Sequence, residues 1–250
     1  MIKTLIYAVL EKLGSDIRKK KAKQIIKSLF SADAVITIFD VGAHVGQSAS
    51  YYKSIFKNSN IYSFEPFQNS FEILRRLNLT NFKPYNLGLS DEKGVESFNS
   101  NKGSPTNSLL SLSLSAQEAW GGNEGLSQVE RVECEFTTLD DFCDENNVEF
   151  IDFLKIDVQG AEFRVLKGAH IALSEKRIGV IQLEVILVDT YKGQKTPGYY
   201  IRLLEDYDYK LAYVSDLSFI NGELVQFDLF FKLKWIESFM TAEPVNFGDY

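Results

Sequence analysis

The sequence predicts an α/β domain in which a mostly parallel β-sheet carries helices on both faces. Short apolar runs of strand-like character alternate along the chain with segments of helical periodicity, which is the pattern of a parallel sheet. Two neighbouring runs end in glycines or in a carboxylate, as expected where a ligand site begins at the edge of such a sheet. The 250 residues, 45% of them hydrophobic, suit one domain with a full core.

The strands and helices of this sheet follow in chain order. Apolar runs predict five strands, over residues 35–41, 60–64, 82–87, 151–157 and 179–186. Helical periodicity between them predicts helices over residues 47–56, 69–77 and 161–173. A helix over 199–207 then precedes two strand-like runs, over 210–214 and 224–232. These two runs are expected to pair antiparallel at one edge of the sheet, because the Asn221-Gly222 dipeptide between them favours a hairpin.

One region interrupts the alternation of strands and helices. Residues 95–98 and 129–137 look like strands, and an inserted loop over about 99–128 separates them. The loop is rich in Ser, Asn and Gly, and a loop of this length in a compact domain is usually functional or mobile. Because it follows the third strand, we expect it to rise beside the glycine turn described below, as part of a lid that faces the substrate.

Residues 1–31 are predicted to form a helical extension ahead of one domain over residues 32–250. Apolar residues at helical spacing indicate one helix over 2–13 and a second over 15–29. This pair of helices would either pack on the domain or cover its site. Residues 18–23 carry a basic cluster, which is either a solvated helix face or a weak contact with an acidic membrane surface or an anionic partner.

Composition and charge restrict the partners and the compartment. The net charge of -7 argues against nucleic acid as a partner. The apolar stretch over residues 1–10 is too short to span a bilayer, so stable membrane insertion is not expected. The two cysteines, Cys134 and Cys143, suit a reducing compartment, and we expect a cytoplasmic protein. No cluster of His, Cys and carboxylates has the spacing of a metal site, so no metal is expected.

The turn after the first strand is the most informative feature of the chain. Asp40 is followed by Gly42 and Gly46, and the neighbouring strand ends in Glu65. Glycines let the backbone turn tightly and approach a ligand, and the amides at the start of the next helix lack partners within that helix. A carboxylate at the end of the neighbouring strand can accept hydrogen bonds from both hydroxyls of a ribose. This layout is typical of a nucleoside-type cofactor site, although an ordinary strand-turn-helix also needs glycines.

The spacing of the glycines distinguishes two classes of cofactor. Dinucleotides favour G-x-G-x-x-G, whereas this chain has G-x-x-x-G and carries His44 at the position of the second glycine. S-adenosylmethionine has no pyrophosphate, and its amino-acid tail and sulfonium need only the turn and a nearby carboxylate such as Asp40. The pattern therefore favours S-adenosylmethionine, with a nicotinamide dinucleotide as the alternative. His44 itself is either a hydrogen-bonded structural residue or a catalyst.

Two further strands end in charged residues. Side chains alternate along a strand, so Lys155 and Asp157 point to the same face. Such a pair is costly to bury unless it is paired or serves a site, although a surface ion pair beneath a loop is an alternative. Glu184 interrupts an otherwise apolar run. It is either a carboxylate that lines the cleft or a structural residue, which is then exposed to solvent or paired with a lysine.

Together these residues resemble the FkbM family of S-adenosylmethionine-dependent methyltransferases. The matching segments run in the family's order, over residues 40–46, 64–66, 107–110, 138–141, 155–162, 165–169 and 183–185. The combination is specific, although each piece alone is not. Two positions depart from the family pattern, since His44 replaces an Asn and Gln159 replaces a Glu.

The resemblance implies a Rossmann-like class I methyltransferase fold, with a seven-stranded, mostly parallel sheet whose last strand is antiparallel. It implies S-adenosylmethionine as cofactor and O-methylation, often of a sugar hydroxyl in a glycan or natural product. The resemblance also implies the contacts of each part of the cofactor. The ribose would lie on Glu65 and the adjoining Pro66, and the adenine beside Gly88, Leu89, Ser90 and Asp91. The methionine tail would lie beside Asp40, Gly42, His44 and Gly46, and the reacting methyl group near Asp157.

A sugar hydroxyl is a poor acid, so its methylation needs a base or a cation. We expect Asp157 or Glu184 to take the proton and Lys155 to stabilise the developing oxyanion. The acceptor would be a glycan or a small molecule, and the oligomeric state is open. Two alternatives are a nicotinamide-dependent oxidoreductase and a scaffold that binds S-adenosylmethionine without turnover.

Overall fold

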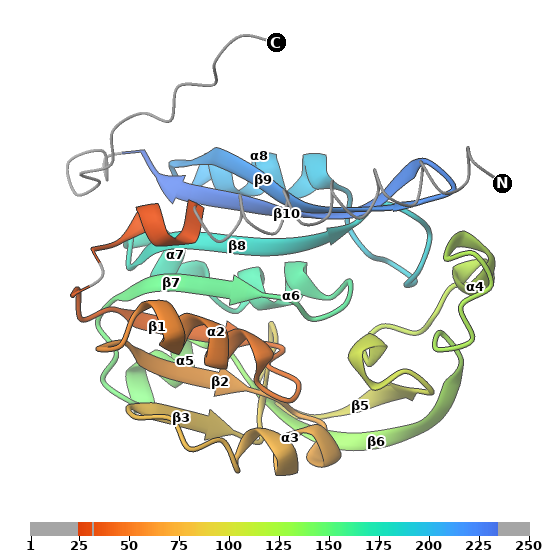
Figure 1. The fold of residues 1–250 in the computed structure, drawn as a ribbon, viewed down its shortest axis with the longest axis horizontal. Helices are drawn as coiled ribbons and strands as arrows, with labels where there is room; N and C mark the ends of the chain where they lie inside the picture. The colour runs from red at the N-terminus through yellow and green to blue at the C-terminus, as the bar shows by residue number, and fades with distance from the viewer. Residues whose placement is uncertain (1–24, 32, 235–250) are drawn as a thin grey trace, which may run out of the picture.

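The main feature of the computed structural model is a seven-stranded sheet (Figure 1), within the described residues 25–31 and 33–234. Its strands are β1 (Thr37–Val41), β2 (Asn60–Phe64), β3 (Phe82–Tyr85), β7 (Ile151–Ile156), β8 (Ile178–Ile186), β9 (Tyr209–Ile220) and β10 (Glu223–Leu233), in the spatial order β3-β2-β1-β7-β8-β10-β9. β1, β2, β3, β7 and β8 pair in parallel, whereas β10 runs antiparallel to β8 and β9. The predicted mostly parallel sheet with an antiparallel last strand is confirmed.

The predicted antiparallel hairpin is present at one edge of the sheet, and its second strand is the inner one of the pair. β10 turns back through Asn221 and Gly222, whose positive φ values of 51° and 85° are those that a tight hairpin turn requires. β10 then enters the sheet between β8 and β9 and leaves β9 as the edge strand. Both strands are also longer than their apolar runs indicated.

Helices cover both faces of the sheet because successive side chains of the central strands point to opposite sides. On one face, Ile38 and Phe153 pack with the helical residues Ile26 and Leu29 and with α2 (Gln47–Ile55). On the other face, Phe39 and neighbouring strand residues pack against four helices, α5 (Leu139–Glu145), α6 (Glu162–Lys167), α7 (His170–Ser174) and α8 (Pro197–Asp206). The remaining helix of this sheet, α3 (Gln68–Leu74), follows β2.

The predicted helix over 161–173 is wrong in one respect, because the structure has two helices there, α6 and α7. Asp140 lies in α5, and its carboxylate accepts the amide N–H groups of Ile171 (2.8 Å) and Ala172 (2.9 Å). These amides therefore start a new helix at α7. Between the two helices Gly168 packs so closely that a Cβ would lie 2.0 Å from the carbonyl oxygen of Ser90.

The region that interrupts the alternation forms a second, three-stranded sheet, at the lower right of Figure 1. Its strands are β4 (Gly88–Leu89), β5 (Gly94–Asn101) and β6 (Gln128–Thr137), in the order β4-β6-β5. The segment between β5 and β6 contains the short helices η1 (Ser104–Thr106) and α4 (Ala116–Ala119). Two hydrogen bonds join this segment to the loops that follow β7 and β8. Ser108 Oγ donates to the carbonyl oxygen of Gln159 (2.7 Å), and Tyr191 Oη donates to the carbonyl oxygen of Thr106 (2.8 Å).

The predicted helix over 2–13 and the basic cluster over 18–23 lie outside the described residues. The division at residues 31 and 32 stays a prediction. Among the described residues, no helix is long and apolar enough to cross a bilayer.

Candidate active site

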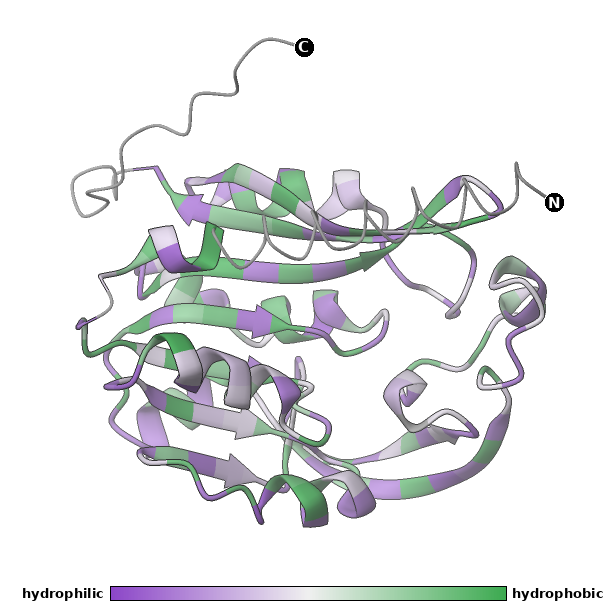
Figure 2. Ribbon diagram, in the orientation of Figure 1, coloured by the Kyte–Doolittle hydropathy of each residue, from purple (hydrophilic) through white to green (hydrophobic). Residues whose placement is uncertain are grey.

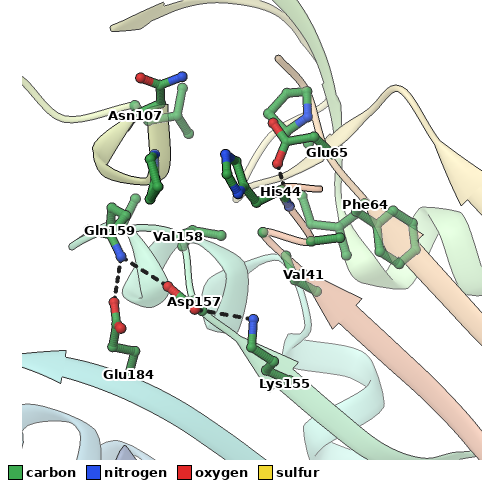
Figure 3. Close-up of a pocket in the computed structure, with 18 of the residues that line it drawn as sticks. Val41, His44, Phe64, Glu65, Asn107, Lys155, Asp157, Val158, Gln159 and Glu184 are labelled. Carbon is green, nitrogen blue, oxygen red and sulfur yellow. Dashed lines mark hydrogen bonds and ion pairs between the residues drawn. The ribbon is translucent and has the colours of Figure 1, made fainter. Parts of the chain in front are cut away.

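A cavity of about 350 Å³ opens at the carboxyl ends of β1, β2 and β7 (Figure 3). Clefts of this size at this edge of a parallel sheet are typical ligand sites. The sequence-predicted residues that line it are Gly42, His44, Glu65, Pro66, Gly88, Leu89, Lys155, Asp157 and Glu184. The sequence-predicted residues outside its lining are Asp40, Gly46, Ser90 and Asp91.

The glycines of the turn are required by close packing within the protein. Gly42 has a φ of 78°, and a Cβ there would lie 1.8 Å from the carbonyl oxygen of Asp157. Gly46 has a φ of 88°, and a Cβ there would meet the side chain of Leu77 at 2.3 Å. Larger residues would push β1 away from β7 or the start of α2 away from α3. The glycines thus bring the turn against the end of β7, where Asp157 lies.

Glu65 holds the turn in place through its buried carboxylate, which is 6% exposed. One carboxylate oxygen accepts the amide N–H of His44 (2.8 Å) and the other accepts that of Phe67 (2.9 Å). Burial raises the pKa of Glu65 to about 7, despite these two hydrogen bonds. Because each carboxylate oxygen can accept two hydrogen bonds, Glu65 retains one acceptor position on each oxygen.

His44 is a non-glycine residue in the left-handed region, with a φ of 49°. This conformation aims its amide at Glu65, while its imidazole lines the cavity (Figure 3). Burial lowers the pKa of His44 below its ordinary value, so the ring is neutral at physiological pH. The neutral ring can therefore donate a hydrogen bond to a ligand or accept one from it.

Lys155 joins two strands through ion pairs at the floor of the cavity. Its Nζ lies 3.2 Å from Asp40 Oδ1 and 3.2 Å from Asp157 Oδ2. The strand register sets Asp40 beside Lys155, and the alternation of side chains on β7 turns Lys155 and Asp157 to one side. Burial raises the pKa of Asp40, and the charge of Lys155 only partly offsets this effect. Asp40, with its side chain 0% exposed, thus supports Lys155 from beneath the cavity.

Asp157 and Glu184 form a pair of carboxyls that Gln159 bridges (Figure 3). The side-chain amide of Gln159 donates to Asp157 Oδ1 (3.0 Å) and to Glu184 Oε2 (2.5 Å). Burial and the neighbouring charge of Asp157 hold the pKa of Glu184 well above its ordinary value. Although burial opposes it, the charge of Lys155 holds the pKa of Asp157 below its ordinary value. Asp157 therefore loses its proton before Glu184 does as the pH rises.

Ser90 and Asp91 lie behind the wall of the cavity rather than in it. The carboxylate of Asp91 accepts a hydrogen bond from Arg164 Nε (2.5 Å), and the same guanidinium makes two bonds to Glu96, of 2.8 and 2.9 Å. This network ties α6 to the second sheet. Asp91 therefore fixes the position of the loop after Leu89.

Sequence reasoning did not assign several residues of the cavity wall. The second sheet contributes Phe98 and Phe136, and the inserted segment contributes Pro105, Asn107 and Leu109. Asn107 and Leu109 belong to the small motif over 107–110 that the family resemblance had singled out, which was the available signal. Phe98 and Phe136 alternate with polar residues in the sequence, as residues of a partly exposed strand do. Only the pairing of β5 with β6 in the second sheet shows that both side chains belong to one wall of the cavity.

The residues present fit S-adenosylmethionine. Glu65 retains acceptor capacity for two ribose hydroxyls, and the apolar wall of Leu89, Phe98 and Phe136 suits a purine ring. Asp157 and the glycine turn supply polar groups on the opposite side. The described residues hold no cluster of three or more His, Cys, Asp or Glu side chains placed to bind a metal ion.

Comparisons with known proteins identify the family of this chain. The model of the FkbM methyltransferase domain matches residues 40–211. The 2-O-methyltransferase NoeI of Sinorhizobium fredii is 28% identical over 185 residues, which cover 70% of this chain and 72% of that protein. The methyltransferase sdnD of Sordaria araneosa is 31% identical over 153 residues, which cover 52% of this chain and 59% of that protein.

Among solved structures, the methyltransferase FkbM from Methylobacillus flagellatus KT aligns with a TM-score of 0.49 and 14% identity, over 78% of this chain and 43% of that chain. The family match spans the glycine turn, Glu65, the cluster of Lys155 and Asp157, and Glu184. The chain therefore belongs to the FkbM methyltransferase family and is an S-adenosylmethionine-dependent methyltransferase with the Rossmann-like class I fold.

Proposed function

We propose that the protein methylates a hydroxyl group of a sugar, in a glycan or a natural product. The observation that carries this proposal is the cluster of Lys155, Asp157 and Glu184 at the floor of the cavity, because a hydroxyl acceptor needs a group that takes its proton. The similarity to a protein named as a 2-O-methyltransferase supports the same chemistry.

The cofactor would be held mainly by the turn and by the ends of β2 and β4. Glu65 would accept both ribose hydroxyls, with Pro66 beside them. Gly88 and Leu89 would line the adenine, while Gly42 and His44 would line the methionine tail. The four predicted residues outside the lining would act indirectly: Asp40 through Lys155, Gly46 through the turn, and Ser90 and Asp91 through the loop that follows β4.

S-adenosylmethionine supplies a methyl group bonded to a sulfonium, and the acceptor oxygen bonds to that carbon while the carbon–sulfur bond breaks with its electron pair going to sulfur. The protein must align the hydroxyl and remove its proton. The hydroxyl becomes strongly acidic as its oxygen bonds to carbon, so even a weak base suffices if it is adjacent. Asp157 is ionised at neutral pH and meets this requirement, with the proton passing to one of its oxygens.

The other two members of the cluster have different roles in this proposal. The pKa of Glu184 is raised whereas that of Asp157 is lowered, so Glu184 would hold Asp157 and the acceptor by hydrogen bonding while Asp157 takes the proton. Lys155 keeps Asp157 ionised and places a positive charge beside the acceptor oxygen. The sequence left two candidate bases, Asp157 and Glu184. These roles favour Asp157 as the base.

Two variants test the proposal. Asp157→Asn keeps the size of the side chain but removes the base, so we expect kcat to fall by about 10²- to 10⁴-fold, the usual contribution of a general base. Glu184→Gln keeps a neutral hydrogen-bonding group and should cost far less. Activity is measured as transfer of labelled methyl to a panel of methyl glycosides, and binding as the Kd of S-adenosylhomocysteine.

The control is that both variants bind S-adenosylhomocysteine like the parent protein. An Asp157→Asn protein that binds S-adenosylhomocysteine normally and keeps full activity would contradict the assignment. A parent protein that binds S-adenosylhomocysteine but methylates nothing would favour the scaffold alternative.

A further inference from the structure

A band of polar side chains crosses five strands of the main sheet, β1, β7, β8, β10 and β9, on the face that α2 covers. The strand register places Asp40 beside Lys155 and Lys155 beside Gln182. One pleat further, Glu184 lies opposite Asp228 on β10, and Asp228 lies opposite Ser215 on β9. Central strands of such sheets are normally apolar on both faces, and Figure 2 shows hydrophilic positions interrupting β7 and β8.

The members of this band hold one another in place. Tyr52 of α2 donates its hydroxyl to Gln182 Oε1 (3.2 Å), and Gln182 Nε2 donates to Asp228 Oδ2 (2.5 Å). Gln226 Nε2 donates to Glu184 Oε1. Gln182 is only 7% exposed and Asp228 only 9%, and these hydrogen bonds offset the cost of burying the two polar side chains.

The band forms one wall of a second cavity, of about 340 Å³. Its lining combines residues of α2 with residues of β7 to β10: Ser48, Tyr51, Tyr52, Lys155, Asp157, Gln182, Glu184, Asp216, Ser218, Gln226 and Asp228, together with Ile26. Lys155, Asp157 and Glu184, with Ser48, also line the cofactor cavity. The two cavities therefore meet at the groups that the proposed function assigns to methyl transfer.

We propose that this second cavity binds the acceptor, and that the acceptor is a polyhydroxyl compound without an anionic group, such as a neutral sugar ring. This inference rests on the proposed function. A ring seated here places a hydroxyl at the junction of the two cavities, beside Asp157. Its other hydroxyls meet the amide groups of Gln182 and Gln226, which, like hydroxyls, both donate and accept hydrogen bonds.

The charges of the described lining disfavour an anionic acceptor. The described lining contains the four carboxyl groups of Asp157, Glu184, Asp216 and Asp228, and Lys155 is its only basic side chain. Lys155 is already paired with two carboxylates, so no cation remains in this lining for a carboxylate or phosphate of the acceptor. Burial raises the pKa of Asp228 to about 8, so its carboxyl is protonated at neutral pH and can donate to a hydroxyl oxygen.

Matched sugars that differ only at C6 test this inference. The protein is assayed with labelled S-adenosylmethionine against methyl glucoside and methyl glucuronide, and against methyl galactoside and methyl galacturonide. We expect kcat/KM for the uronide to be at least about tenfold below that of its neutral partner, because a buried charge without a partner costs at least as much as one unpaired polar group. Uronides accepted equally or better would overturn the inference.

Variants of the cavity wall separate this inference from the proposed function. Asp228→Leu should raise KM for the neutral sugar by about tenfold or more without changing the Kd of S-adenosylhomocysteine, since Asp228 lines only the second cavity. Asp228→Asn should restore most of the lost affinity. Asp206→Asn, at an exposed position of α8, is the matched control and should behave like the parent protein.

The remaining outcomes are also decisive. Methylation of uronides alone keeps the proposed function and overturns the inference, as does an Asp228→Leu protein with an unchanged KM. Binding of S-adenosylhomocysteine with no methylation of any sugar contradicts both.

Discussion

Lowering the pH from 8 to 6 should weaken cofactor binding through Glu65. The carboxylate accepts two backbone amides and retains acceptor positions for two ribose hydroxyls. Those hydroxyls bind the ionised form better, since a protonated carboxyl loses acceptor capacity and the charge that strengthens such bonds. Burial raises the pKa of Glu65 to about 7, so this group titrates within the range in which the protein can be handled.

The magnitude follows from the ionised fraction of Glu65. With a pKa of about 7, the carboxylate is roughly 90% ionised at pH 8 and roughly 10% ionised at pH 6. The apparent Kd scales inversely with the binding-competent fraction, so it should rise about tenfold between these two pH values. The sign follows from the raised pKa: affinity is complete above the folded-state pKa and declines as the pH falls through it.

Isothermal titration of S-adenosylhomocysteine at pH 8, 7 and 6 measures this effect. Glu65→Gln should bind more weakly at every pH and should lose the pH dependence. His44→Asn removes the other titrating group of the turn and should keep the dependence, because burial holds the pKa of His44 below its ordinary value. An affinity that is flat from pH 8 to pH 6 in the parent protein, or a dependence that disappears in His44→Asn, would refute the reasoning.

Three further substitutions have defined outcomes. Lys155→Met leaves two carboxylates without their shared partner and should lower the free energy of unfolding by about 3–5 kcal/mol, measured by urea denaturation. Gln159→Glu replaces the bridging amide by a third acid, which should raise the pKa of Asp157 and move the acid limb of the pH–rate profile upward by about one pH unit. Asp140→Ala leaves two helix amides without their acceptor, that of Ala172 in a buried contact and that of Ile171 in a partly buried one, and should cost about 1–3 kcal/mol in the same denaturation assay, whereas Asp141→Ala at an exposed position should cost almost nothing.

Local patterns were sufficient to predict the main sheet. Apolar runs located its strands, and Asn221-Gly222 located the hairpin, because these features depend on neighbours in sequence. The break between α6 and α7 was not predictable in this way. It depends on Asp140, which lies about thirty residues earlier in the chain and accepts the first amides of α7 only after folding.

The site residues that could be predicted from the sequence are charged residues at the ends of apolar strands, because a charge at such a position usually serves a site. Glu65, Lys155 and Asp157 followed from charges at the ends of apolar runs, and the structure places all three on one cavity. The role of Gln159 did not follow, because the sequence showed only the loss of a carboxylate and not the two acids that its amide bridges.

The polar band had a signal that could have been used. Gln226 and Asp228 alternate with apolar residues in the last strand, as Gln182 and Glu184 do in β8. The alternation places each pair on one face, but only the register of β10 against β8 brings the two pairs together.

The most direct test of methyl transfer to oxygen uses S-adenosylmethionine labelled with ¹³C in its methyl group. The protein is incubated with the labelled cofactor and the neutral methyl glycosides, and the product is examined by NMR. We predict that the label appears as a methyl ether on a ring hydroxyl, and that Asp157→Asn forms this product about 10²- to 10⁴-fold more slowly while it still binds S-adenosylhomocysteine. Label on nitrogen or carbon, or an undiminished ether signal from Asp157→Asn, would contradict the account.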